Sequence, residues 1–263
     1  MRKNTCAIVI LGPSMLYLAP SEEQRQSRHQ IDWPERFKTL AKQAKSPALK
    51  RYYEAGICAA ETPIADAPMV AVDFETTGMD VAQHGIVSIA VIPMSLGRIQ
   101  QGAAKTWLVK PRRVLTEQSV TIHGITHSAI EQAPDLEAII EPLLEAVAGK
   151  VWVVHYHGIE RPFLQDALRE RLGESIEFPL IDTMAIEARF RRQQQGIIDR
   201  LVDKIKGRQP PSIRLADSRE RYHLPFYAPH DAMTDALACA ELLQAQVAYH
   251  FPNDVRLADV WLP

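Results

Sequence analysis

The fold of this protein is indicated by the stretch Val70-Ala71-Val72-Asp73-Phe74-Glu75-Thr76-Thr77-Gly78. It begins with a continuous apolar run, typical of a buried strand, and two carboxylates and a turn follow directly. Because strand side chains alternate, Asp73 and Glu75 should point to the same side, where two like charges favour a bound cation. By chance alone, about four acidic-x-acidic matches are expected at this acidic content, so a solvated strand end is the alternative.

Strand and helix patterns alternate around this stretch. Strands are predicted at 69–74, 86–94, 105–109, 151–154 and 180–181. Helices are predicted at 135–148, 159–172, 183–192, 197–206, 212–222 and 232–249, with two short leading helices at 33–45 and 47–57. This order predicts an α/β or mixed-sheet domain. We expect four parts: a flexible N-terminal tail (1–30), a helical lead (31–66), a main domain (67–250) and a C-terminal tail (251–263).

The charge balance excludes a protein whose whole surface is a polycation built to coat nucleic acid. The 263 residues include 30 Lys and Arg against 32 Asp and Glu, a formal charge of −2. A local basic patch is compatible with this balance. Residues 187–214 contain eight basic and three acidic side chains. This segment is a candidate for tracking a nucleic-acid backbone, and an ordinary solvated helix face is the alternative.

The cysteines and apolar runs restrict the class further. Cys6, Cys58 and Cys239 are odd in number, far apart and not in a Cys-x-x-Cys spacing, which predicts neither a disulfide framework nor a zinc knuckle. A reducing, cytoplasmic location is expected. The apolar runs at 69–72 and 86–94 are shorter than the roughly 18–20 residues of a membrane-spanning helix, so no membrane association is expected.

Two further segments place polar residues beside predicted strands and helices. In Val151-Trp152-Val153-Val154-His155-Tyr156-His157-Gly158-Ile159-Glu160, a strand ends in a turn and Glu160 opens a helix. A favourable interaction with the helix dipole is the alternative explanation for this carboxylate. In Pro229-His230-Asp231-Ala232-Met233-Thr234-Asp235-Ala236, His230 and Asp235 would lie about 140° apart on a continuous helix. They can converge only if His230 precedes the helix and Asp235 lies on it.

These segments resemble the DnaQ-like 3′–5′ exonucleases of the DEDD superfamily, in the subgroup whose third motif carries a histidine. The first motif is similar to Asp-x-Glu-Thr-Thr-Gly, at 73–78, and the third to His-x-x-x-x-Asp-Ala, at 230–236. Between these motifs, two further segments are similar to family landmarks and come in the expected order. The first consists of residues 122–126 with 133–134, and the second of residues 181–183. The resemblance covers about residues 68–248. It implies an RNase H-like mixed β-sheet flanked by helices, here with a short N-terminal helical extension.

The resemblance also implies a chemistry and a set of partners. Two Mg²⁺ or Mn²⁺ ions would be held by four carboxylates, those of Asp73, Glu75, Glu160 and Asp235. His230 would act as general base on the attacking water. The substrate would be single-stranded nucleic acid with a free 3′ end, with DNA favoured over RNA. The products would be nucleoside 5′-monophosphates. A replication or repair protein is the expected protein partner.

Four residues are candidates for binding the substrate: Thr76, Thr77, Met79 and His155. The first three are implied by the resemblance to meet the terminal nucleotide. For His155, and for its neighbour His157, turn-stabilising hydrogen bonds are the alternative. Asp182 is expected to be structural rather than a metal ligand.

The second motif departs from the family pattern. The family usually has His-Asn-Ala-x-Phe-Asp, whereas 155–160 reads His-Tyr-His-Gly-Ile-Glu. Glu160 keeps the negative charge but adds a methylene, and Asp166 would face about 120° away from it on the same helix. The alternative function is therefore a nucleic-acid-binding module with the nuclease fold and weak or no turnover. A structural α/β domain with coincidental carboxylates is the third interpretation.

Overall fold

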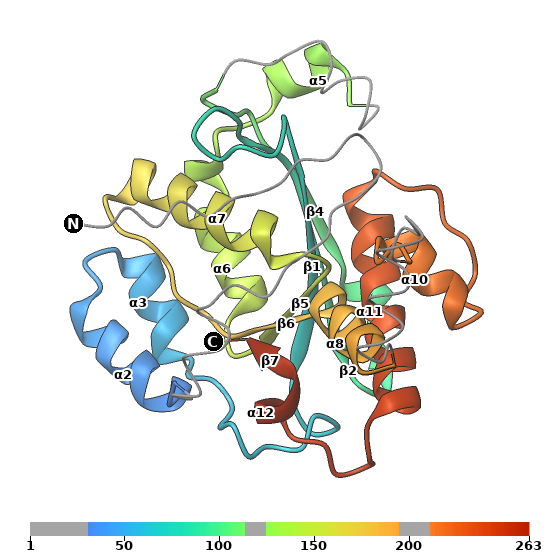
Figure 1. Cartoon of the computed structure of the whole chain (residues 1–263). Coiled ribbons are helices and arrows are strands. Elements are labelled where there is room, and N and C mark those ends of the chain that lie inside the picture. The colour runs from blue at the N-terminus through green and yellow to red at the C-terminus, as the bar shows by residue number, and fades with distance from the viewer. Residues whose placement is uncertain (1–30, 114–124, 195–210, 263) are drawn as a thin grey trace, which may run out of the picture.

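The computed structural model describes residues 31–113, 125–194 and 211–262. Several features predicted from the sequence lie outside this part of the chain. They are the N-terminal tail, the helix 197–206, the landmark residues 122–124 and most of the basic segment 187–214. Within the described residues, the α/β fold class is confirmed. A mixed sheet lies between two groups of helices (Figure 1).

Seven strands of the described residues form one sheet. Along the chain they are β1 (Met69–Thr76), β2 (Ile86–Ser95), β3 (Arg98–Ile99), β4 (Lys105–Leu108), β5 (Val151–Val154), β6 (Leu180–Asp182) and β7 (Trp261–Leu262). The order across the sheet is β3-β2-β1-β5-β6-β7, and β4 also pairs with β2. β1 is parallel to β5, and β5 is parallel to β6; the other pairs are antiparallel.

The apolar run at the start of β1 explains the central place of this strand. Met69, Val70, Ala71 and Val72 are all fully buried, as expected for a strand covered on both faces. The neighbouring β5 is buried throughout its length. The register between β1 and β2 shifts between Glu75 and Thr76, where the strand ends and the polar motif begins.

Helices cover both faces of the sheet. The helices of the domain are α5 (His127–Gln132), α6 (Ile140–Val147), α7 (His157–Leu172), α8 (Thr183–Gln194), α10 (Leu215–Arg221), α11 (Ala232–His250) and α12 (Leu257–Val260). Figure 1 shows α6 and α7 on one side of the sheet and α8, α10 and α11 on the other. α11 packs directly on β1, β2 and β5. None of the helices in the described residues has both the length and the apolar character needed to cross a membrane.

The leading helices form a hairpin attached to the domain. α2 (Trp33–Gln43) starts at the cap Asp32, and α3 (Pro47–Glu54) follows and packs against α6. Arg36 pairs with Glu177, whose backbone N–H donates to the Tyr53 hydroxyl at 2.9 Å. The carboxylate of Glu174 accepts from the backbone N–H groups of residues 45 and 46 at 2.9 and 2.7 Å. The hairpin therefore docks on the turn between α7 and β6.

Several predicted boundaries differ from the observed ones. The predicted helix 135–148 is a short 3₁₀ turn (Leu136–Ala138) followed by α6, because Pro142 is accepted only in the first turn of a helix. α5 was not predicted by the sequence. In the segment expected as a C-terminal tail, β7 pairs with β6, so the sheet continues beyond residue 250.

Candidate active site

Three carboxylates from two distant parts of the chain meet at the end of β1. Asp73 and Glu75 come from the strand, and Asp235 comes from the first turn of α11. One oxygen from each of the three lies within 4.8 Å of the others. Glu75 is buried, whereas Asp73 and Asp235 are partly exposed. The strand alternation predicted from sequence thus places Asp73 and Glu75 together, and the packing of α11 on β1 brings in Asp235.

Glu160, in the first turn of α7, lies outside this group of three, but it is near enough for the charge of Asp73 to act on it. Its side chain is 2% exposed, and its Oε2 is buried without a hydrogen-bond partner. Burial raises its pKa well above the ordinary value, and the nearby charge of Asp73 raises it further. A hydrogen bond from its own backbone lowers this pKa, as an interaction with the helix N-terminus would, but it does not offset the effect of burial.

The cluster is electrostatically unfavourable without a cation. Burial, followed by the charges of Glu75 and Asp235, raises the pKa of Asp73 well above its usual range. Burial raises the pKa of Asp235 to about 6, with the charge of Glu75 adding to the effect. Carboxylates so close in a partly dry site compete for protons, and a positive ion would relieve the repulsion.

The donor set fits a hard divalent cation. All four groups are carboxylates, and no histidine or cysteine is among them, which favours Mg²⁺ or Mn²⁺ over zinc. The unpartnered Oε2 of Glu160 is the kind of buried atom that a metal ligand leaves in a protein without its ion. Asp73, Glu75, Glu160 and Asp235 are therefore the residues that could hold the metal.

The turn after β1 is held by its own threonines. Thr76 Oγ1 donates to the carbonyl of Gly78 at 2.8 Å, and Thr77 Oγ1 accepts from the Gly85 N–H at 3.0 Å. The Nδ1 of His84 lies 3.2 Å from Thr77 Oγ1, and its ring would be 2.6 Å from a Cβ at position 78, so a side chain there would have to displace this ring. The next side chain, Met79, is 58% exposed. Substrate binding by Thr76, Thr77 and Met79 stays a prediction.

The turn between β5 and α7 has an unusual backbone. Tyr156 adopts a left-handed conformation with φ 90°, which is sparsely populated for any residue with a Cβ. Its ring lies over Gly158, where an added Cβ would be 2.6 Å from the tyrosine Cζ. Tyr156 was not among the residues predicted for the site, although the sequence has this tyrosine at the position where the family usually has asparagine, two residues before Gly158.

Asp182 ties this turn to α8. Its fully buried carboxylate accepts four backbone N–H groups, at distances between 2.8 and 3.2 Å, from residues 156, 157, 184 and 185. It also accepts from the Nδ1 of His157 at 2.6 Å. Burial alone would raise its pKa, but the hydrogen bonds and charge of His157 hold the pKa below the usual value. These contacts agree with the expected structural role.

The two histidines of the turn both face protein groups. His157 pairs with Asp182, and the Nδ1 of His155 lies 2.9 Å from the Thr183 hydroxyl. Burial lowers the pKa of His155 to about 4, so this ring is neutral at physiological pH. The contacts are those of the turn-stabilising alternative. A contact of His155 with substrate stays a prediction.

His230 lies before α11, as its spacing from Asp235 required. The helix starts at Ala232, after the cap Asp231, whose side chain accepts from the Thr234 N–H at 2.9 Å. His230 is exposed and has φ 72°, and its backbone N–H donates to Oδ2 of Asp235 at 2.9 Å. The left-handed turn thus fixes the histidine next to the carboxylate cluster. The capping role of Asp231 was missed by the sequence analysis, although Asp is a preferred cap.

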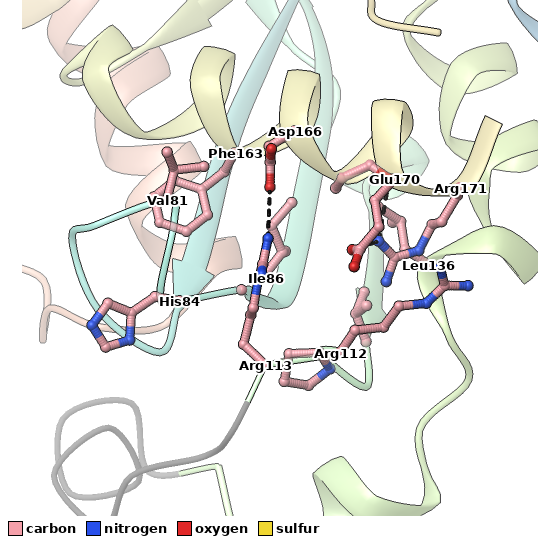
Figure 2. A pocket seen from close by; sticks show the side chains of 14 residues that line it. Val81, His84, Ile86, Arg112, Arg113, Leu136, Phe163, Asp166, Glu170 and Arg171 are labelled. Atoms are coloured by element: carbon pink, nitrogen blue, oxygen red, sulfur yellow. Dashed lines mark hydrogen bonds and ion pairs between the residues drawn. The ribbon is translucent and has the colours of Figure 1, made fainter. Parts of the chain in front are cut away.

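Asp166 is engaged elsewhere on α7. Figure 2 shows it pointing toward Arg113 in a small hollow on the side of the helix, and their charged atoms are 3.2 Å apart. Phe163 and Leu136 also line this hollow. Asp166 is therefore not an alternative to Glu160 as a metal ligand.

Arginines in the described part of the basic segment form hydrogen bonds and ion pairs with other residues of the protein. Arg189 donates to the carbonyl of Asp259 at 2.9 Å, and Arg191 pairs with the buried Glu187 at 3.1 Å. Glu187 in turn pairs with Arg221. A role of residues 187–214 in binding nucleic acid stays a prediction.

Comparison with known proteins gives relatives from bacterial DNA polymerases. The chain is 28% identical over 145 residues to the DNA polymerase III PolC-type of Thermotoga maritima, covering 55% of this chain and 10% of that protein. It is also 28% identical over 186 residues to the DNA polymerase III subunit epsilon-like protein of Rhodobacter capsulatus, covering 69% and 24%. The chain thus spans a quarter or less of the length of these two relatives.

Solved structures share the fold. Cell-death related nuclease 4 (CRN-4) superposes with a TM-score of 0.56 at 20% identity, covering 72% of this chain and 66% of that one. Exonuclease X, solved in complex with 5′ overhanging duplex DNA, gives 0.52 at 23% identity, covering 73% and 98%. The RNase H-like fold is thereby confirmed. The sequence model of the exonuclease family RNase_T matches residues 70–243, so this chain belongs to that exonuclease family.

Proposed function

We propose that this protein is a metal-dependent 3′–5′ exonuclease that acts on single-stranded nucleic acid, with DNA favoured over RNA, and releases nucleoside 5′-monophosphates. The observation that carries the proposal is the meeting of Asp73, Glu75 and Asp235 within 4.8 Å, together with the buried Glu160, whose pKa the charge of Asp73 raises. Membership of the exonuclease family supports the reaction class. The direction and the substrate rest on the motifs.

Each group of site residues has its own role in the proposed reaction. The four carboxylates would hold two divalent ions, Mg²⁺ or Mn²⁺, which when bound offset the charge of the phosphodiester and of its leaving 3′ oxygen. His230, on its exposed turn, would accept the proton of the attacking water at a ring nitrogen. Thr76, Thr77 and Met79 would contact the terminal nucleotide from the turn after β1. His155 completes the proposed binding set.

A replication or repair protein is proposed as a partner, because the relatives named above are polymerase III proteins. A cytoplasmic location is part of the same proposal. It rests on the odd number and wide spacing of the three cysteines in the sequence.

A time course on labelled strands tests the reaction. Single-stranded DNA and RNA of equal length, labelled at either end, are incubated with Mg²⁺, Mn²⁺ or a chelator. A 5′ label should give a ladder that shortens in single-nucleotide steps, and a 3′ label should appear at once as mononucleotide. Salt-sensitive binding without any metal-dependent shortening would instead favour the binding-module alternative. Internal cuts would refute exonuclease action, and immediate release of the 5′ label would refute the 3′–5′ direction.

Glu160 can be tested in the same assay. Glu160→Ala should abolish most turnover in both metals, whereas Glu160→Asp should preserve or raise the rate with Mg²⁺, which demands stricter geometry than Mn²⁺. Glu170→Ala is the matched control, because Glu170 is an exposed carboxylate on the same helix. If Glu160→Ala and Glu170→Ala both match wild type, Glu160 does not belong to the site.

A further inference from the structure

Phe226 is the most exposed of the large apolar side chains in the part of the chain that the structure describes. It is 80% exposed, compared with 71% for Tyr249, 58% for Met79 and 39% for Leu108. It lies in the connection between α10 and α11, four residues before His230. Single exposed apolar side chains are common on protein surfaces, so exposure alone assigns no role to this ring. Its place in the connection that also carries the candidate general base makes the bound substrate a candidate for its partner.

The residues on both sides of Phe226 are tied to the protein. The buried guanidinium of Arg219 donates to the carbonyl of Pro225 at 2.9 Å and lies 4.5 Å from the ring centroid of Tyr227. The Tyr227 hydroxyl donates to Glu241 Oε1 at 3.0 Å, and Arg219 donates to the other oxygen of that carboxylate at 2.7 Å. Phe226 is thus the side chain that points outward between two anchored neighbours.

The ends of the connection are fixed as well. His223 has φ 55° and His230 has φ 72°, and neither is glycine. The N–H of Leu224 donates to the carbonyl of Arg219 at 3.1 Å. A loop with left-handed residues at both ends and hydrogen bonds along it has little freedom to fold its aromatic ring back onto the surface. The backbone that carries the exposed ring is therefore preorganised, and binding would have to order only the side-chain torsions of Phe226.

The short connection limits how far Phe226 can lie from the site. Four residues of extended chain span at most about 14 Å, so the Cα of Phe226 lies within that distance of the Cα of His230. Stacked nucleotides rise about 3.4 Å each, so a separation in this range corresponds to the first few nucleotides of a strand whose 3′ end lies at the carboxylate cluster. Aromatic side chains bind single strands by stacking on bases, and every base offers a suitable face.

We propose that Phe226 is a stacking residue for a nucleobase of the single-stranded substrate, a few nucleotides away from the terminal phosphodiester. The inference rests on the proposed function, because it assumes that the strand ends at the carboxylate cluster. It adds a base-contacting residue that would retain the strand between cleavage steps.

Binding gives the first test. Wild type, Phe226→Ala, Phe226→Trp and Tyr249→Ala are titrated with a 5′-fluorescein single-stranded DNA octamer in Ca²⁺, and anisotropy is measured. Phe226→Ala should weaken binding roughly 5- to 150-fold, the range that removal of one stacked base produces. Phe226→Trp should bind at least as tightly as wild type. Tyr249→Ala is the control, because its ring is similarly exposed but lies at the far end of α11.

Kinetics with Mn²⁺ separate this inference from the proposed function. For Phe226→Ala, KM on the octamer should rise more than KM on a dinucleotide, with kcat changing less than KM. If wild type cleaves and Phe226→Ala matches it in octamer binding and KM, the stacking inference is wrong and the exonuclease stands. If wild type binds without cleaving and Phe226→Ala binds weakly, stacking stands and the exonuclease is wrong. If wild type neither binds nor cleaves, both are wrong.

Discussion

Removing the charge of Asp73 should stabilise the metal-free protein. Asparagine has almost the same shape as aspartate, so Asp73→Asn leaves the packing intact and removes one of the three charges that lie within 4.8 Å of one another. At an effective dielectric constant of about 20, two unit charges at that separation repel by about 3.5 kcal/mol. Protonation already relieves part of this repulsion in wild type. We therefore expect a net gain of about 1–3 kcal/mol at pH 8.

The pH dependence has a definite sign. Asp73 and Asp235 have raised pKa values in the folded protein, to about 6 for Asp235, so the folded state binds more protons than the unfolded state. The stability they permit is present below their ordinary pKa, near 4, and is lost as the pH rises through their raised pKa values, which for Asp235 means through about 6. The advantage of Asp73→Asn over wild type should consequently be larger at pH 8 than at pH 5.

The assay is urea unfolding followed by far-UV circular dichroism, with a chelator, at both pH values. Asp66→Asn is the control, because Asp66 is an exposed carboxylate just before β1. A second measurement adds Mn²⁺: a ligand at 100 times its Kd stabilises by about 2.7 kcal/mol, and Asp73→Asn should lose most of that gain. If the variant is no more stable than wild type in chelator at pH 8, and the metal stabilises both equally, the carboxylate cluster is not a metal site.

Three further changes test other parts of the site. His230→Ala should slow hydrolysis about 10²- to 10⁴-fold in single-turnover kinetics while Mn²⁺ still raises the melting temperature; a wild-type rate would exclude it as the general base. Asp182→Asn places an amide donor against the donors of His157 and should cost about 3–5 kcal/mol in urea unfolding, and a loss under 1 kcal/mol would contradict the structural role of Asp182 in joining this turn to α8. Gly158→Ala should cost about 1–3 kcal/mol because its methyl meets the Tyr156 ring, and in a double-mutant cycle Tyr156→Ala should remove part of that cost; additive costs would exclude the clash.

The strands and helices of the domain could be predicted because they depend on local patterns. The apolar run before Asp73 predicted β1, and the alternation of strand side chains predicted that Asp73 and Glu75 share one side. The spacing of His230 and Asp235 predicted a turn before the helix, and α11 begins after that turn. These features need only the chemistry of neighbouring residues and the period of the backbone.

The assembly of the site was decided by tertiary structure. Asp235 reaches the cluster because α11 packs across β1, and the burial of Glu160 arises because β5 runs parallel to β1 and leads into α7. The left-handed turn of Tyr156 persists because Asp182, 26 residues further on, binds its backbone N–H. The short β7 likewise forms only where β6 offers a free edge. The sequence by itself determined which residues could act together, whereas their convergence depended on long-range packing and buried hydrogen bonds, because no local pattern records which distant surfaces meet.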